Sequence, residues 1–214
     1  MELVKRCRRG HRYKLNNEAI KSLLNAEVRD LKVAVISVFG KGSGIIFELL
    51  LKYANHRFKE ERSANDDWLA EAIDPRKDTV VRTKPITIWP EFFVTNTRKL
   101  GKIAILLMGS QGILSFEEEA GTFAINVLMS SCQLFIVNRR ISEEQLKHLE
   151  TFTEFAKRLQ DVGVINKAFQ HLVFLVRGWE TPTQYDFGFE GGHRYLIESV
   201  IHEARLAPGR LKTR

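Results

Sequence analysis

The chain has 214 residues, of which 44% are hydrophobic and 28% charged, and it carries a formal net charge of +7. That length and hydrophobic content are enough to bury a substantial core, and one domain is the economical arrangement. Its two cysteines, Cys7 and Cys132, exclude a disulfide framework and are expected to be reduced thiols in a cytosolic setting. The sequence shows no apolar stretch long enough to span a membrane and no secretory signal.

Basic residues gather at both ends of the chain, six of them within residues 5–14 and four within 205–214. No aromatic residues interleave the C-terminal run, so solvated tails are favoured over a nucleic-acid site. We therefore expect a basic tail over residues 1–12, a domain over 13–206 and a second basic tail over 207–214. Peripheral contact with an anionic membrane stays an open alternative.

The first predicted elements are a short strand at residues 13–15 and a helix capped by Asn16 or Asn17. A β-branched apolar strand begins at residue 33, breaks into a glycine-rich turn over residues 39–44 and leads into an apolar helix over 45–53. Residues 55–84 are highly charged and show little apolar periodicity, which is typical of a functional or mobile loop.

Further strands are predicted at residues 85–94, 102–108, 132–137 and 172–176. Pro90 favours an edge or a bulge in the first of these, which would pair with the second as a hairpin. One helix is expected over residues 118–129. A second is expected to begin after a capping box formed by Ser142 and Gln145, and a last one at Gly191 and Gly192. This alternation predicts an α/β fold in three layers, with a mostly parallel sheet and helices on both faces.

Three strand ends would converge in such a sheet, at residues 39–44, 109–112 and 177–179, where ligands of α/β proteins bind. The first has the layout of a phosphate-binding loop, G-x-x-x-x-G-K-[ST]. In that frame the chain has Ser37, four residues, and then Gly42, Ser43 and Gly44. The lysine and the Mg²⁺-binding hydroxyl are therefore missing, and a tight turn that binds nothing is the alternative.

Three longer segments carry a more specific signal: residues 105–112 (ILLMGSQG), 144–154 (EQLKHLETFTE) and 169–179 (FQHLVFLVRGW). They resemble the large GTPases of the atlastin and guanylate-binding protein family, most closely the atlastin branch, and the resemblance runs from about residue 13 to residue 196. It implies a P-loop GTPase fold, G domains that dimerise across their nucleotides and, in atlastins, fusion of endoplasmic reticulum membranes.

The resemblance also identifies the family's nucleotide-contacting positions, and this sequence departs from most of them. In the phosphate loop, the transition-state arginine position is Gly40, the lysine position is Ser43 and the Mg²⁺-binding serine position is Gly44. No catalytic residue is therefore assigned, the family's catalytic positions being Gly40 and Gln111.

Switch two and the base-reading pair depart as well. The family's Asp-Thr-Gln-Gly is replaced by the run GSQG at residues 109–112, and in the base-reading Arg-Asp pair Arg177 is followed by Gly178. Thr83 alone matches the switch-one threonine, which makes it the one candidate Mg²⁺ ligand. If nucleotide binding is retained, the resemblance implies contacts from Lys41, Gly42, Ser43, Gly44, Thr83, Ser110, Gly112, Arg177 and Gly178.

At least three charged contacts are missing, each worth roughly 1.5–3 kcal/mol. Treated as additive, the loss is about 4–9 kcal/mol, or on the order of 10³ to 10⁶ in affinity. GTP and Mg²⁺ are thus expected as cofactors only if binding is retained.

The first functional hypothesis is a cytosolic pseudo-GTPase of this family that acts through protein partners. Its G domain would pair with a second copy or a relative, and a partner would bring it to the cytosolic face of the endoplasmic reticulum. The second hypothesis is an active GTPase in which Lys41 or Lys84 reaches the phosphates instead. A third reading is an incomplete product. Trp179 is expected to pack under the loop and not to bind a ligand.

Overall fold

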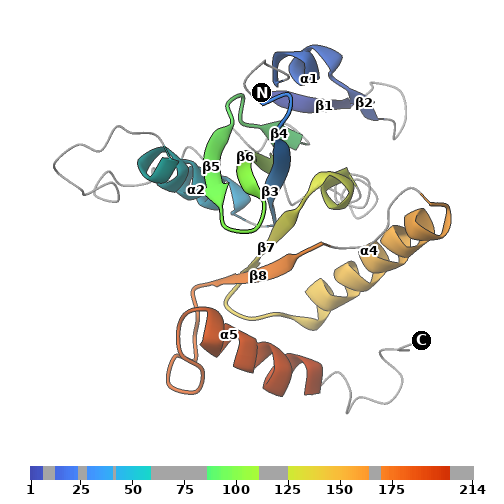
Figure 1. Ribbon diagram of the computed structural model, residues 1–214. Coiled ribbons are helices and arrows are strands. Elements are labelled where there is room, and N and C mark those ends of the chain that lie inside the picture. The colour runs from blue at the N-terminus through green and yellow to red at the C-terminus, as the bar shows by residue number, and fades with distance from the viewer. Residues whose placement is uncertain are drawn as a thin grey trace.

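The computed structural model describes residues 1–6, 13–23, 28–40, 42–58, 86–110, 125–163 and 170–202 (Figure 1). In chain order the elements are β1 (Glu2–Arg6), β2 (Tyr13–Leu15), α1 (Asn17–Leu23), β3 (Lys32–Gly40), α2 (Ser43–Phe58), β4 (Ile86–Ile88), β5 (Phe93–Thr97), β6 (Gly101–Ser110), β7 (Cys132–Asn138), α4 (Glu143–Asp161), β8 (Leu172–Arg177), α5 (Phe189–Tyr195) and a π-helical turn η2 (Leu196–Ile201). Residues 125–129 form one further helical segment.

The described strands form one mixed sheet in the order β2-β1-β4-β6-β3-β7-β8, with β5 also paired to β6. Its central part is parallel, since β3 pairs with both β6 and β7, and β7 pairs with β8. The strands β1, β4 and β5 add antiparallel pairings. Parallel strands need crossover connections, which the intervening helices supply. The α/β fold class is confirmed.

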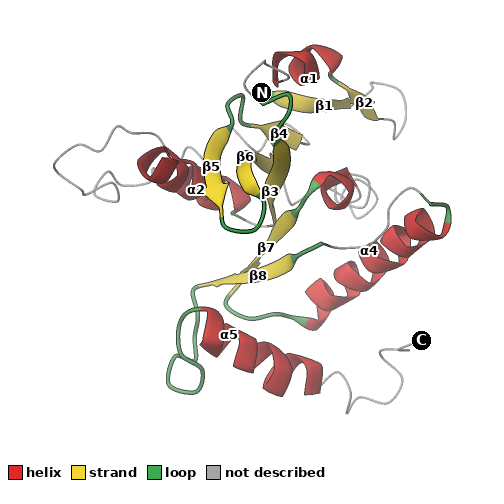
Figure 2. Cartoon of the chain, in the orientation of Figure 1, coloured by secondary structure: helices red, strands yellow, loops and turns green. Residues whose placement is uncertain are grey.

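Helices cover both faces of this sheet (Figure 2). Alternate residues of β3 point to opposite faces, so Val38 packs with Ile46 and Phe47 of α2, whereas Phe39 packs with Leu149 of α4. A further core beside β1 and β4 includes Leu3, Ile86, Ile88 and Met108. The three-layer arrangement follows from strands that are apolar on both faces.

Several predicted elements hold, and three differ. The expected basic tail contains β1, whose Leu3 is buried, because residues 2–6 add to the sheet between β2 and β4. The strand predicted over residues 85–94 is two strands, β4 and β5, separated around Pro90, which has no N–H to donate to a ladder. The last helix begins at Phe189, before Gly191, and continues into η2.

Candidate functional site

The turn that resembles a phosphate loop is much shorter in the structure than the sequence pattern predicts. β3 stays in register with β7 through Phe39↔Phe135 and Gly40↔Ile136, and α2 begins at Ser43. Only Lys41 and Gly42 therefore separate strand from helix. A phosphate loop offers a run of unpaired backbone N–H groups to its ligand, whereas here the residues up to Gly40 lie in a strand ladder.

Gly40 makes this extension of the strand feasible. It has φ +115°, a conformation that side chains with a Cβ rarely adopt, and an added Cβ would overlap the carbonyl oxygen of Ile136 in β7. A long arginine side chain at this position would require β3 to separate from β7. The two strands can therefore approach this closely because position 40 carries no side chain.

Ser43 occupies the family's lysine position, and its side chain faces inward. Its hydroxyl donates to the backbone carbonyl of Ser110 at 3.0 Å, and the residue is 4% exposed. A lysine could reach out to neutralise phosphate, but this short hydroxyl stabilises the junction between α2 and the end of β6 instead.

The end of β6 is held by further buried hydrogen bonds. The Ser110 hydroxyl donates to the carbonyl oxygen of Val38 at 3.4 Å and accepts from Nδ2 of Asn126 at 2.6 Å. On β3, the Ser37 hydroxyl accepts a hydrogen bond at 2.6 Å from the hydroxyl of Ser130, which follows the helical segment at residues 125–129. Because these groups are buried, each satisfied pair offsets a desolvation cost and fixes the local register.

Gly109 stands where the family places the carboxylate that fixes hydrated Mg²⁺. A Cβ built on Gly109 would lie 3.2 Å from a ring carbon of Phe47 in α2. Phe47 is 7% exposed and packs in the core between α2 and the sheet. The space for a side chain at position 109 is therefore taken by an aromatic ring.

Arg177, at the end of β8, lies against the phosphate-like turn. A Cβ on Gly42 would overlap the Nη1 atom of Arg177, so the guanidinium covers that side of Gly42. Gly178 has φ +61°, and the nearest atoms to an added Cβ are Oδ1 of Asn138 at 3.8 Å and Cγ of Arg139 at 3.9 Å. Unlike positions 40 and 109, this one has room for a side chain.

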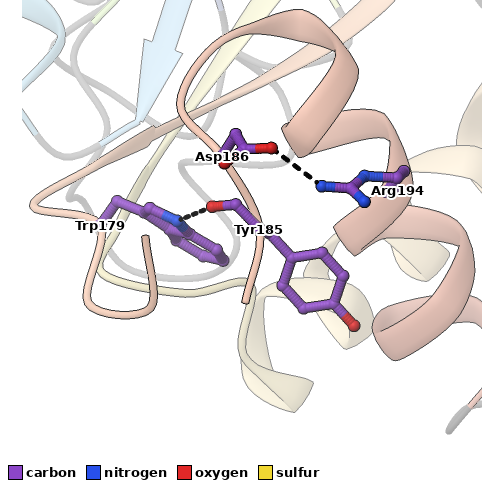
Figure 3. A network of polar contacts seen from close by, with 4 residues as sticks. All are labelled: Trp179, Tyr185, Asp186 and Arg194. Atoms are coloured by element: carbon purple, nitrogen blue, oxygen red, sulfur yellow. Dashed lines mark hydrogen bonds and ion pairs between the residues drawn. The ribbon is translucent and has the colours of Figure 1, made fainter. Parts of the chain in front are cut away.

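An aromatic cluster holds the segment after Arg177 (Figure 3). The indole N–H of Trp179 donates to the carbonyl of Tyr185 at 2.8 Å, and its ring meets Tyr195 edge-on with centroids 4.7 Å apart. Asp186 and Arg194 form an exposed ion pair at 3.1 Å. Trp179 thus packs beneath this segment, as predicted.

Close packing in the same segment explains one of its glycines. A Cβ on Gly191 would overlap the backbone of Asp186, so the first turn of α5 approaches the chain there more closely than any other residue allows. The segment is accordingly held to α5 by the Trp179–Tyr185–Tyr195 cluster and by this close backbone approach.

The structure brings together the three strand ends that the sequence predicted would converge. Ser43 contacts Ser110, and Gly42 contacts Arg177. Of the other residues named for nucleotide or catalysis, Lys41, Thr83, Lys84, Gln111 and Gly112 lie outside the described residues. Their roles stay predictions.

Positions 43, 44 and 109 lack the side-chain groups that would hold a triphosphate and its cation, and only the guanidinium of Arg177, beside Gly42, is suited to a phosphate among the described side chains named for this site. Ser43 is bonded inward, Gly44 has no ligand atom, and Phe47 fills the space beside Gly109. No group of three or more His, Cys, Asp or Glu residues gathers at metal-binding distance in the part of the chain that the structure describes. We derive no chemical step through Mg²⁺ or GTP.

Sequence reasoning missed Phe47 and Asn126, which help to shape this site. Phe47 carried a signal, because it belongs to the apolar face of the helix after the turn, but its contact with Gly109 depends on how closely α2 approaches β6. Asn126 lies in a stretch that looked simply helical. Only the tertiary structure shows its amide bonded to Ser110.

Cys132 is a free thiol at the start of β7. Burial raises its pKa above the ordinary value, because the interior disfavours the thiolate. Among the described helices, none combines the length and the apolar character required to cross a bilayer.

Comparison with known proteins gives a consistent assignment. Residues 10–206 match the family model described as guanylate-binding protein, N-terminal domain. Human Atlastin-3 is 32% identical over 200 residues, covering 87% of this chain and 36% of the relative. Human Atlastin-2 is 31% identical over 194 residues, covering 87% and 33%, and Bos taurus Atlastin-1 is 31% identical over 200 residues, covering 87% and 35%.

The chain spans about a third of the length of these curated relatives. The match covers every described strand except β1, together with the phosphate-like turn and the segment after Arg177. With its parallel central strands and helices on both faces, the chain belongs to the guanylate-binding protein N-terminal domain family, together with the atlastins.

Proposed function

We propose that this protein is an atlastin-type G domain in which GTP binding and hydrolysis are weakened or lost, and that it acts by binding protein partners. The partner is a related G domain, or a second copy, at the cytosolic face of the endoplasmic reticulum. The fold and the family membership support the first part of the proposal, that the chain is a G domain. The residues at the three strand ends support the second part, that GTP binding and hydrolysis are weakened or lost.

The observation that carries the proposal is the β3–α2 turn. A phosphate loop would use backbone N–H groups over residues 37–44, of which residues up to Gly40 here lie in the ladder with β7, and a lysine where Ser43 bonds to Ser110. Opening the turn would break strand pairing, and the uncharged Ser43 cannot supply the charge of the missing lysine. The guanidinium of Arg177 lies against Gly42.

Isothermal titration of the full chain with a non-hydrolysable GTP analogue tests this proposal. We expect no Mg²⁺-dependent binding at micromolar concentration, because roughly 4–9 kcal/mol of charged contacts is missing. Micromolar, Mg²⁺-dependent binding would overturn the loss of nucleotide binding. Human Atlastin-3, whose G domain is similar to this chain, serves as the positive control.

An exposed apolar surface supports the partner half of the proposal. Phe187 is 74% exposed and Phe189 is 81% exposed, and both flank the start of α5. Ile197, on the following turn, is 46% exposed. Neighbouring exposed aromatic side chains are common at protein–protein contacts because they bury a large area at small entropic cost.

Association measurements on a double variant, Phe187→Ser with Phe189→Ser, test the partner surface. Sedimentation of the chain, alone and mixed with a G domain of a relative, should show an association that weakens at least tenfold in the variant. Val162→Ser is the matched control, because Val162 is 72% exposed after α4 and lies away from the Phe pair. Equal weakening in both variants, or no association of the parent chain with either partner, would contradict this surface.

A further inference from the structure

The hairpin of β5 and β6, which lie side by side in Figure 1, ends in a short basic turn. Thr97 and Gly101 are the last facing pair of its antiparallel ladder. The three residues between them, Arg98, Lys99 and Leu100, form what we call the β5–β6 tip. All three are exposed, and Leu100 is 55% exposed. The tip therefore presents two cations beside an apolar side chain.

Hydrogen bonds through Thr97 fix the shape of the tip. The backbone N–H of Leu100 donates to Oγ1 of Thr97 at 3.0 Å, and that hydroxyl donates to the carbonyl oxygen of Gly101 at 3.1 Å. Gly101 has φ +69°, a conformation that glycine adopts without steric cost. The turn is closed by its own bonds, so Leu100 is held at the surface and is not folded back onto the sheet.

Two lysines flank the tip, one on each face of the sheet. Lys102 follows Gly101 in β6, and Lys32, at the start of β3, lies beside Ile103 in the parallel ladder. Neighbours in a ladder share a face and successive residues of a strand alternate, so Lys32 and Lys102 point to opposite faces. Both are exposed, and along the strands both lie within about 7 Å of Gly101.

The end of the sheet around the tip is basic. Residues 93–110, which make up the hairpin, contain three cations and no carboxylate. In the turn before β3, the charges of Arg29 and Asp30 offset each other. Within the described part of the chain, none of the four cations at or beside the tip forms an ion pair. Their charge is therefore available to attract an anionic partner.

The arrangement of charge and apolar surface indicates what kind of partner fits. Cations at the tip and on both faces of the sheet are not arranged around one small anion, but they can all contact a plane that meets the sheet end-on. An anionic bilayer is such a plane, and each Lys or Arg close to its surface adds to the attraction. Leu100 can enter the boundary between headgroups and acyl chains, as apolar residues of interfacial segments do. The tip has no aromatic side chain on which a nucleic-acid base would stack.

We propose that the β5–β6 tip binds an anionic membrane surface: Arg98 and Lys99 contact lipid headgroups, the two flanking lysines add to the attraction, and Leu100 enters the interface. About 26 Å of extended strand separates Lys102 from Ser110, so the tip and the phosphate-like turn lie at opposite ends of the sheet. Membrane contact at the tip would leave that turn directed away from the lipid. It requires neither a nucleotide nor a protein partner.

Co-sedimentation of the full chain with vesicles tests the proposal. Vesicles of phosphatidylcholine with phosphatidylserine should retain the chain at low salt, and vesicles of phosphatidylcholine alone should not. Arg98→Gln with Lys99→Gln should weaken retention at least tenfold, because each cation near an anionic surface contributes a gain of about fivefold. The matched control is Lys157→Gln with Arg158→Gln, which removes the same charge from exposed positions on α4 and should change retention by less than about twofold.

A second pair of variants tests the apolar contact. Leu100→Ser should weaken retention severalfold, whereas Val162→Ser should leave it unchanged, because Val162 is 72% exposed but follows α4. Leu100→Trp adds a reporter whose fluorescence should shift to shorter wavelength on anionic vesicles, and Val162→Trp should show no such shift. All these positions are exposed, so the variants should keep the fold, which thermal melting verifies.

Several outcomes would overturn the proposal. Equal weakening by the two double variants would show that net charge or the basic chain ends explain retention. A parent chain that anionic vesicles do not retain, or retention that neither the Arg98/Lys99 variant nor Leu100→Ser weakens, would rule out the tip. If polyglutamate or single-stranded RNA competes fully with the vesicles and Leu100→Ser has no effect, the tip is a general anion-binding surface and the membrane assignment is wrong.

Discussion

Glycines stand at positions 40, 109 and 178, where the resemblance implies charged side chains, and their surroundings differ. Gly40 approaches the backbone of β7, Gly109 lies under the ring of Phe47, and Gly178 borders open space. Restoring a side chain is therefore prohibitive at the first, requires repacking at the second and is tolerated at the third. The sequence predicted all three replacements, and the structure shows how the surroundings of the three glycines differ.

Gly40→Ala should lower the free energy of unfolding by about 2 kcal/mol or more, because a Cβ there meets both an unfavourable φ and a backbone oxygen. Gly178→Asp should cost less than about 1 kcal/mol, since φ +61° lies in a region that Asp adopts most readily after Gly and Asn. Urea unfolding of the two variants measures the difference. A larger loss at position 178 than at 40 would contradict this account.

Gln133 is a polar side chain in an apolar place. It is 2% exposed, and neither its Oε1 nor its Nε2 has a hydrogen-bond partner within the described structure. Gln133→Met keeps the length and removes the unpaired groups, so it should raise the free energy of unfolding by about 1–3 kcal/mol. Exposed Gln184→Met is the control and should change it by less than about 0.5 kcal/mol. Destabilisation by Gln133→Met would show that the amide is paired.

Cys132 predicts a dependence of stability on alkaline pH. Its folded pKa is raised by burial, so above about pH 8.5 the unfolded thiol loses its proton while the folded thiol keeps it. The unfolded state then binds fewer protons, and stability must fall as pH rises toward the folded pKa. Cys132→Ala should make the decline above about pH 8.5 less steep. Guanidinium unfolding at a series of pH values measures this dependence. If the free energy of unfolding falls equally steeply with pH in parent and variant, the raised pKa of Cys132 is contradicted.

Elements whose sequence signals are local were predicted well. The Ser142–Gln145 capping box is present in both directions, with Gln145 N–H to the Ser142 hydroxyl at 3.3 Å and Ser142 N–H to Gln145 Oε1 at 2.9 Å. Ser142→Ala should lower the free energy of unfolding by about 1 kcal/mol, and Ser142→Gly by a few tenths. Thermal melts of both variants compare the two losses of stability. A larger loss for Ser142→Gly than for Ser142→Ala would contradict the capping role.

Elements that depend on distant contacts were predicted less well. β1 was assigned to a tail because its basic residues dominate the local composition, but pairing with β2 and β4 overrides that signal. The end of β3 looked like a loop because of its glycines. Ladder pairing with β7 extends the strand through Gly40, and no local pattern could reveal a partner almost a hundred residues away.

The molecule as a whole shares its central strand between two cores. Val38 belongs to the core under α2, and Phe39 to the core under α4 and α5. Unfolding of the core on one face of β3 would expose the core on its other face, so we expect a single cooperative unfolding transition. Circular dichroism of helix and fluorescence of tryptophan should give coincident denaturation curves. Two separated midpoints would show that the faces unfold independently.

At this scale the α/β class, the two helical layers and the convergence of three strand ends could all be inferred from the sequence. Alternating strands and helices determine the layers, and parallel strands place their carboxyl ends along one edge. The detailed state of the site could not be inferred. It depends on the Ser43–Ser110 hydrogen bond and on Arg177 over Gly42, which arise only once the strands have assembled.

The continuation of β3 along β7 determines how fast the backbone amide hydrogens of this region exchange with solvent. Amide hydrogens of a central ladder exchange with solvent deuterium only when the pairing opens. Residues 38–40 should therefore be among the slow exchangers of the chain, whereas an exposed anion-binding loop without its ligand would exchange rapidly. An anion that docks on these amides must first separate the strands, so its arrival would make exchange at residues 134–136 of β7 faster.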